Sequence, residues 1–318
     1  MSHADTLTIG LAQIAPVWLD RTATLAKVVR SLDEAGRSKC DLVAFGEALV
    51  PGYPVWLDRT GGAVFDSPPQ KQLHAHYMAN AIDIDAGDLD DVRAAAKRNA
   101  TAVYLGLIER PADRGGHSLY ASLVYINKAG EIGSVHRKLM PTYEERLTWS
   151  PGDGHGLRVH PLGAFTVGGL NCWENWMPLP RAALYALGED LHIAVWPGSQ
   201  RNTQDITRFI ARESRSYVVS VSALLRPDDF PDDTPNRAAI VDGMPDLLHD
   251  GGSCVAGPNG EFVLEPQVGN ESLFVVNIDH AKVREERQNF DPVGHYSRPD
   301  VTQLHVNRER QTTARFND

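Results

Sequence analysis

The chain has 318 residues, of which 42% are hydrophobic and 23% are charged, so its composition excludes the disordered and fibrous classes and supports a sizeable buried core. Its formal net charge is -10 and its basic residues form no stripe, which argues against nucleic acids and other polyanions as partners. No apolar stretch approaches the roughly 18 residues of a membrane span, and the first residues lack a secretory signal. We therefore expect a cytoplasmic protein that does not bind membranes.

Strands and helices alternate at the start of the chain, and several strands then follow one another. The predicted strands cover residues 6–13, 41–45, 101–110, 118–127 and 131–138. Apolar side chains recur at helical spacing over 19–37, and a second helix ends near residue 100, after a Pro/Gly-rich loop over 49–56. The turn at 128–130 joins the last two strands as a hairpin, so we expect this part of the structure to be antiparallel.

The second half of the chain returns to alternation. Its predicted strands cover residues 164–171, 191–197, 217–224, 251–257, 261–266 and 272–279. Its predicted helices cover residues 178–188 and 203–216, and a polar helix begins at His280. Strands in both orientations covered by helices are typical of a layered α/β architecture, and periodicity leaves open whether there is one sheet or two.

No linker, charge block or low-complexity tract divides the chain, so we expect one domain over 1–318 with a polar tail from about residue 301. The sequence leaves open whether this tail is disordered or docks on a neighbouring chain. Cys40, Cys172 and Cys254 are widely spaced and form no Cys-x-x-Cys pair, which argues against a disulfide framework or a zinc ribbon. The histidine spacings match no metal-ligand motif, so we predict no metal site.

Three ionisable residues share one position relative to the predicted strands. Glu47, Lys138 and Cys172 each lie just past the carboxyl end of a strand. Ligands of α/β sheets bind outside such ends, so these side chains could meet in one site. A cysteine needs a base or a cation to become a nucleophile, because an ordinary thiol is mostly protonated at neutral pH. A poorly solvated carboxylate would be a suitable base, and a lysine would stabilise negative charge.

Each of these residues also has a purely structural interpretation. Taken alone, Cys172 fits a small buried apolar residue, Glu47 fits a loop carboxylate or a cap, and Lys138 fits a solvated charge at a strand end. The Gly168–Gly169 pair before the cysteine indicates either a close backbone approach or a bulge. Glu174 fits a partner of the site or a carboxylate favoured by a helix N-terminus.

Longer segments resemble a known family. FGEALVPGYPVW, HRKLMPTYEERLTW and GLNCWENWMPLPR are similar to the glutamate, lysine and cysteine signatures of the nitrilase (carbon-nitrogen hydrolase) family, and four further segments extend the similarity from about Leu7 to about Val306. The order and spacing of the seven segments agree with the family. The Cys-Trp-Glu-Asn tetrad resembles the nitrilase branch, whereas amidase and carbamoylase branches tend to carry other residues after the cysteine.

The resemblance implies a four-layer α-β-β-α sandwich with two stacked mixed sheets, and association into homodimers or larger spirals. It implies that Glu47 is the general base, Lys138 the cation, Cys172 the nucleophile, and Glu145 a further carboxylate that positions substrate and base. The implied reaction converts an organic nitrile into a carboxylic acid and ammonia through a thioimidate and a thioester, with no metal or organic cofactor.

Aromatic residues adjoin the expected site residues in sequence. Tyr53, Trp56, Trp173 and Trp176 could line an apolar pocket for the substrate, or they could belong to the core.

Two rival functions also stay open. One is an amidase, a carbamoylase or a cyanide-degrading enzyme with the same nucleophile, and the other is a catalytically silent assembly protein on the same fold.

Overall fold

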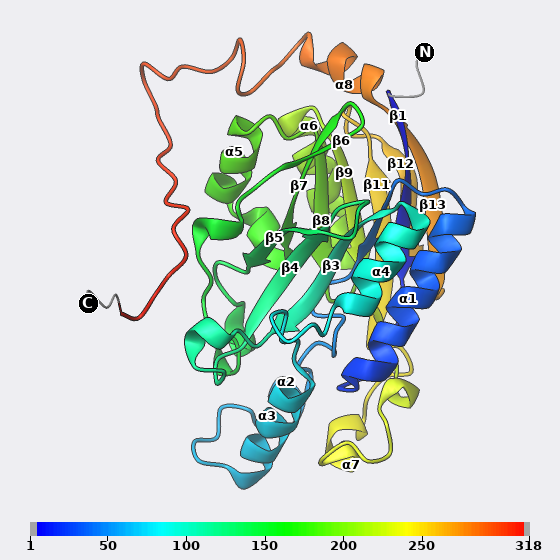
Figure 1. The fold of residues 1–318 in the computed structure, drawn as a ribbon, viewed down its shortest axis with the longest axis vertical. Coiled ribbons are helices and arrows are strands. Elements are labelled where there is room, and N and C mark those ends of the chain that lie inside the picture. Colours follow the sequence, from blue (N-terminus) through cyan, green and yellow to red (C-terminus); the bar gives the residue numbers. More distant parts are fainter. Residues whose placement is uncertain (1–4, 315–318) are drawn as a thin grey trace.

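Two mixed β-sheets stack at the centre of the computed structural model, which describes residues 5–314, and helices cover their outer faces (Figure 1). The four-layer α-β-β-α arrangement predicted above is therefore confirmed. In the described part of the chain, no helix is long and apolar enough to cross a membrane.

The first sheet has the strand order β13-β1-β2-β3-β4-β5. Its strands are β1 (Thr6–Gln13), β2 (Leu42–Phe45), β3 (Ala102–Glu109), β4 (Tyr120–Ile126), β5 (Ile132–Arg137) and β13 (Ser272–Asp279). β1, β2 and β3 run parallel, and β3-β4-β5 is an antiparallel meander. Because two reversals cancel, β5 points the same way as β2, and the carboxyl ends of both strands reach the same edge of the sheet.

The second sheet has the order β10-β11-β9-β8-β7-β6, with β12 paired to β11. Its strands are β6 (His160–Leu162), β7 (Phe165–Asn171), β8 (Leu191–Trp196), β9 (Tyr217–Ser222), β10 (Leu224–Leu225), β11 (His249–Ala256) and β12 (Phe262–Val268). β7, β8 and β9 are parallel, and β8 and β9 are buried along their whole length, which explains their nearly continuous apolar sequences.

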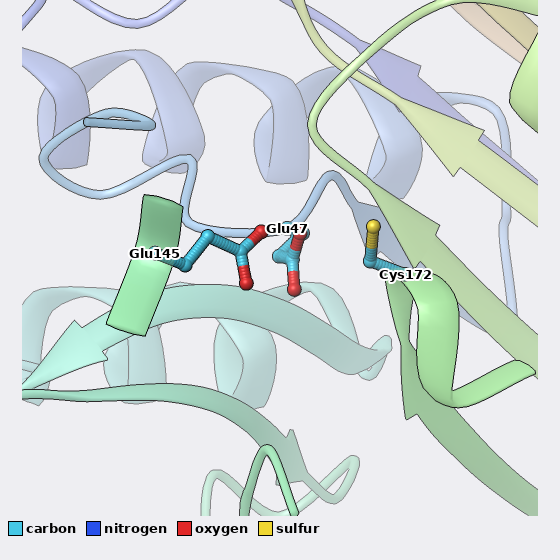
Figure 2. Close-up of side chains that lie close together, drawn as sticks. All are labelled: Glu47, Glu145 and Cys172. Atoms are coloured by element: carbon cyan, nitrogen blue, oxygen red, sulfur yellow. The ribbon is translucent and has the colours of Figure 1, made fainter. Parts of the chain in front are cut away.

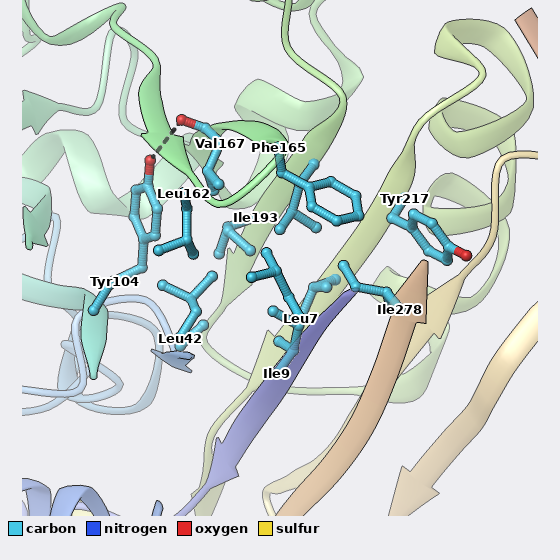
Figure 3. Close-up of a cluster of buried hydrophobic side chains, with 14 of the residues drawn as sticks. Leu7, Ile9, Leu42, Tyr104, Leu162, Phe165, Val167, Ile193, Tyr217 and Ile278 are labelled. Carbon is cyan, nitrogen blue, oxygen red and sulfur yellow. Dashed lines mark hydrogen bonds between the residues drawn. The ribbon is translucent and has the colours of Figure 1, made fainter. Parts of the chain in front are cut away.

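The inner faces of the two sheets form the main core. Leu7, Ile9 and Leu42 of the first sheet belong to the same buried cluster as Phe165 and Ile193 of the second (Figure 3). The alternation of apolar side chains along the strands places one half of them in this cluster and the other half under the helices. Because the two sheets are stacked on this core, strand ends of the first sheet lie opposite strand ends of the second.

Helices close the outer faces. α1 (Arg21–Arg37) and α4 (Asp90–Asn99) cover the first sheet, and α5 (Pro178–Ala186) and α6 (Gln200–Ser214) cover the second. The remaining helices are α2 (Trp56–Arg59), α3 (Pro68–Asn80), α7 (Arg237–Val241) and α8 (His280–Arg287). The structure differs from the sequence prediction between the loop at 49–56 and residue 100, where it has three helices in place of one.

The C-terminal tail lies along its own chain. Residues 301–314 contain no helix or strand, yet the Arg310 guanidinium lies 3.0 Å from the Asp153 carboxylate, and the Gln311 backbone N–H donates to the other oxygen of Asp153 at 2.9 Å. Asp153 is buried, so this contact anchors the described part of the tail. Residues 315–318 of the predicted tail lie outside the described residues.

Candidate active site

Strand ends from both sheets converge on one buried cluster. Glu47 lies two residues past β2, and Lys138 directly follows β5 at the same edge of the first sheet. Cys172 directly follows β7 of the second sheet. Figure 2 shows the side chains of Glu47, Glu145 and Cys172 pointing toward one another. The structure therefore brings together the four residues that the sequence places in the site.

Lys138 is the centre of the cluster. Its Nζ lies 2.9 Å from Glu47 Oε1 and 2.7 Å from Glu145 Oε2, and all three side chains are at most 1% exposed. Single ligand atoms of Glu47, Glu145 and Cys172 all lie within 4.8 Å of one another. Such a trio could hold a metal ion in principle, but the ammonium already contacts both carboxylates, so a metal would have to displace it.

Glu145 is held more firmly than its neighbour Glu144. Glu145 accepts hydrogen bonds from the Tyr53 hydroxyl at 2.8 Å and from the Thr142 backbone N–H at 2.6 Å, in addition to the contact with Lys138. Glu144 is half-buried, and its one hydrogen bond to a described residue is from the Tyr53 hydroxyl at 3.4 Å. Of the two adjacent carboxylates, Glu145 is the one inside the cluster.

Cys172 occupies a sharp turn between a strand and a short helix. Its φ is 48°, in the left-handed region that a non-glycine residue rarely adopts, and it opens the 3₁₀ turn Cys172–Trp176. This turn presents the sulfur to the cluster, and the neighbouring backbone N–H of Trp173 acts to lower the pKa of the thiol. A strained turn at a strand end is a known way to expose a nucleophile to its substrate.

Burial dominates the electrostatics of the cluster. Burial raises the pKa of Glu47 to about 8, against the charge of Lys138. Burial likewise raises the pKa of the Cys172 thiol well above its usual value, with a further contribution from Glu47. Burial opposes the charge on Lys138, but the two carboxylates and the sulfur outweigh it and raise the pKa of the ammonium. At neutral pH the lysine is charged and the thiol carries its proton.

A cavity of about 500 Å³ opens onto the sulfur. Its wall includes Tyr53, Val55, Asp58, Thr142, Glu144, Glu145, Cys172, Trp173, Pro197, Gly198, Ser199, Arg201, Asn202, Leu248 and His249. Two of the four aromatic residues singled out by sequence, Tyr53 and Trp173, are therefore in the wall. The sequence reasoning missed Asp58 of α2, Arg201 at the start of α6 and His249 at the start of β11, because none of them belongs to a motif.

The other two aromatic residues do not line this cavity. Trp56 is 1% exposed and packs edge-on against Trp18 and Tyr77, with ring centroids 6.0 and 4.9 Å away. Trp176 is 46% exposed, with its ring centroid 6.3 Å from that of Trp173. Adjacency in sequence places both near the site without directing their side chains into it.

Comparisons with known proteins agree with this geometry. A family model described as carbon-nitrogen hydrolase matches residues 8–288. The chain is 35% identical to nitrilase 2 of an unknown prokaryotic organism, over 100% of this chain and 98% of that one. It is 32% identical to an aliphatic nitrilase of Rhodococcus rhodochrous, over 98% of this chain and 86% of the relative.

Solved structures include proteins with a similar fold. The crystal structure of a carbon-nitrogen hydrolase from Helicobacter pylori G27 has a TM-score of 0.70 and 20% identity, and covers 93% of this chain and 96% of that one. Sequence match, fold and the buried glutamate-cysteine cluster all lead to one assignment: the chain belongs to the carbon-nitrogen hydrolase family.

Proposed function

We propose that this chain is a nitrilase that hydrolyses an organic nitrile to the carboxylic acid and ammonia, with Cys172 as the covalent nucleophile. The observation that carries the proposal is the cluster of Glu47, Lys138 and Glu145 against a cysteine that opens onto a cavity. Nitrilases at 32–35% identity over nearly the whole chain support the choice of nitriles within the family.

The first step forms the carbon-sulfur bond. Because the resting thiol is protonated, Glu47 takes its proton as the sulfur attacks the nitrile carbon. Glu47 Oε2 is buried and accepts no hydrogen bond from the described residues, so it is free to receive this proton. Negative charge develops on the substrate nitrogen, where the Lys138 ammonium and the Trp173 backbone N–H stabilise it. Glu47 then gives this proton to the substrate nitrogen, which forms the thioimidate and restores the Glu47 carboxylate.

Two water molecules complete the reaction. Glu47 removes a proton from the first water as the water oxygen adds to the thioimidate carbon, and cleavage of the carbon-nitrogen bond releases ammonia. The thioester left behind is attacked by a second water, and cleavage of the carbon-sulfur bond gives the carboxylic acid and restores the thiol. Glu145 touches Lys138 throughout and holds the ammonium beside the reacting nitrogen.

The nucleophile can be tested directly. Cys172→Ala should abolish ammonia release from nitriles, and the wild-type protein quenched during turnover should carry a substrate-sized adduct on the peptide that contains Cys172. Cys254→Ser is the matched control, because Cys254 is also buried and its thiol donates to the Thr207 hydroxyl at 3.6 Å, away from the cluster. An active Cys172→Ala protein, or an adduct on another peptide, would rule out the assignment.

A substrate panel tests the choice of nitriles. Aliphatic, aryl and arylacetonitriles, the matching amides, N-carbamoyl compounds and cyanide should be assayed for ammonia, with identification of the organic product. The proposal expects nitriles to react faster than their amides and to give the acid. Faster turnover of amides or carbamoyl compounds would assign another branch of the family, and no adduct with any compound would favour an assembly protein.

A further inference from the structure

One buried carboxylate near the site has no role in the steps above. Glu174 is fully buried in the turn that begins at Cys172. Its Oε1 accepts from the Leu139 backbone N–H at 2.7 Å, and its Oε2 accepts from the Asn171 backbone N–H at 2.9 Å. His136 Nε2 lies 3.1 Å from both oxygens and is also buried. Four hydrogen-bond contacts therefore converge on one carboxylate.

The backbone donors stand next to two residues of the reaction. Leu139 directly follows Lys138 at the end of β5, and Asn171 directly precedes Cys172 at the end of β7. These strands belong to different sheets and do not pair. In the described part of the chain, every hydrogen bond between segments 136–139 and 171–174 ends on the Glu174 carboxylate.

The charge on Glu174 suits this bridging position. Burial acts to raise the pKa of Glu174, but the contact with His136 and the two backbone N–H groups outweigh it and hold the pKa below its usual value. The side chain is therefore a carboxylate, whose two oxygens can accept from donors on both sides. A neutral amide of the same shape could accept on one side only, and its NH₂ group would face a donor on the other.

We infer that Glu174, oriented by His136, is a positioning residue that fixes the separation between the Lys138 ammonium and the Cys172 sulfur by joining the ends of β5 and β7. The identity of the reaction rests on the proposed function, but the geometric claim does not. A shift of about 1 Å in the reacting groups can reduce a rate by about 100-fold, so a bridge between the two strand ends has direct consequences for turnover.

The test compares Glu174→Gln with Asp190→Asn. Asp190 is a matched control, because it accepts from the Thr166 backbone N–H at 2.7 Å and from His280 Nε2 at 2.9 Å, at the opposite end of β7. Glu174→Gln should lower kcat by about 10- to 100-fold with KM changed less than about twofold. Asp190→Asn should leave both constants within about twofold when each variant is assayed well below its own unfolding temperature.

A second readout needs no nitrile. The rate of Cys172 alkylation by iodoacetamide, located by peptide mass spectrometry, reports the proximity of base and cation to the sulfur. It should fall in Glu174→Gln and not in Asp190→Asn. If the wild type hydrolyses no nitrile but the alkylation rate still falls in Glu174→Gln, only the proposed function is refuted. Equal kcat and alkylation rates in Glu174→Gln and the wild type would overturn the positioning role.

If Glu174→Gln does not fold, two variants of His136 provide the test in its place. His136→Gln keeps an N–H donor for the carboxylate, whereas His136→Phe removes it. The positioning role predicts that kcat in His136→Gln stays closer to the wild type than in His136→Phe, by about tenfold, with similar KM in both. Equal kcat in the two variants would contradict it.

Discussion

Lys138→Met should destabilise the protein as well as inactivate it. The substitution keeps an unbranched, slightly shorter side chain but removes the ammonium that lies 2.9 Å from one buried carboxylate and 2.7 Å from another. Removal of one partner from a buried ion pair costs about 3–5 kcal/mol, because an uncompensated charge stays behind. We therefore expect the free energy of unfolding to fall by about that amount at pH 7.

The pH dependence of this loss follows from Glu47. Burial raises the pKa of Glu47 and Lys138 opposes it, so loss of the ammonium raises the pKa further above about 8. Above pH 8, Glu47 loses its proton in the folded wild type. In the folded variant Glu47 still holds its proton at this pH, whereas in the unfolded variant it is ionised. Stability falls with rising pH wherever the native state binds more protons. The difference between variant and wild type should therefore be larger at pH 9 than at pH 7.

Urea unfolding at both pH values measures this difference, with Lys128→Met as control. Lys128 pairs with Asp41 at 2.6 Å, but both side chains are partly exposed, so its loss should cost no more than about 1 kcal/mol. A Lys138→Met protein that is as stable as Lys128→Met at pH 7 would refute the reasoning. A loss that is smaller at pH 9 than at pH 7 would do the same.

Three further predictions concern the base, its partner and the tail. The raised pKa of Glu47 predicts that kcat/KM increases with pH through a midpoint at about 8, because the base must be ionised, and a midpoint near 4.5 would contradict this. Tyr53→Phe deprives Glu145 of a buried hydroxyl donor and should lower the free energy of unfolding by about 1.5–3 kcal/mol; unchanged urea unfolding would count against that contact. Arg310→Ala removes the partly buried pair with Asp153, so it should lower the free energy of unfolding by about 1 kcal/mol and make the tail more sensitive to trypsin. Equal rates of digestion in the variant and the wild type would contradict this prediction.

The convergence of the site residues could be predicted because it depends on strand direction. Glu47, Lys138 and Cys172 each follow an apolar run whose carboxyl end the sequence marks well. Two antiparallel connections return β5 to the direction of β2, so both strands deliver their next residues to one edge. The strand patterns and the antiparallel character predicted for this part of the chain support the inference for Glu47 and Lys138, and the contact between these two side chains agrees with it. The position of Cys172 also depends on the stacking of the second sheet, which the sequence left open.

The cavity wall could not be predicted, because it depends on long-range placement. His249 is about 75 residues from Cys172 in sequence and reaches the cavity at the start of β11. Trp56 is close to Glu47 in sequence, yet α2 directs it into a cluster with Trp18 and Tyr77. α3 escaped prediction because only two of its side chains are buried, so its sequence shows no apolar stripe at helical spacing.

The glycine pair before the cysteine shows how sheet stacking enters the chemistry. A Cβ on Gly169 would lie 2.7 Å from the Ile193 carbonyl oxygen and 3.1 Å from a methyl group of Leu123, which belongs to the other sheet. The β7 ladder to β8 has no register shift, so close approach, and not a bulge, explains the glycine. Gly169 precedes Cys172 by three residues, so a side chain there would clash with the β8 backbone and crowd Leu123 close to the strand end that carries the sulfur. We therefore expect substitution of Gly169 to disturb the position of the sulfur relative to Glu47 and Lys138.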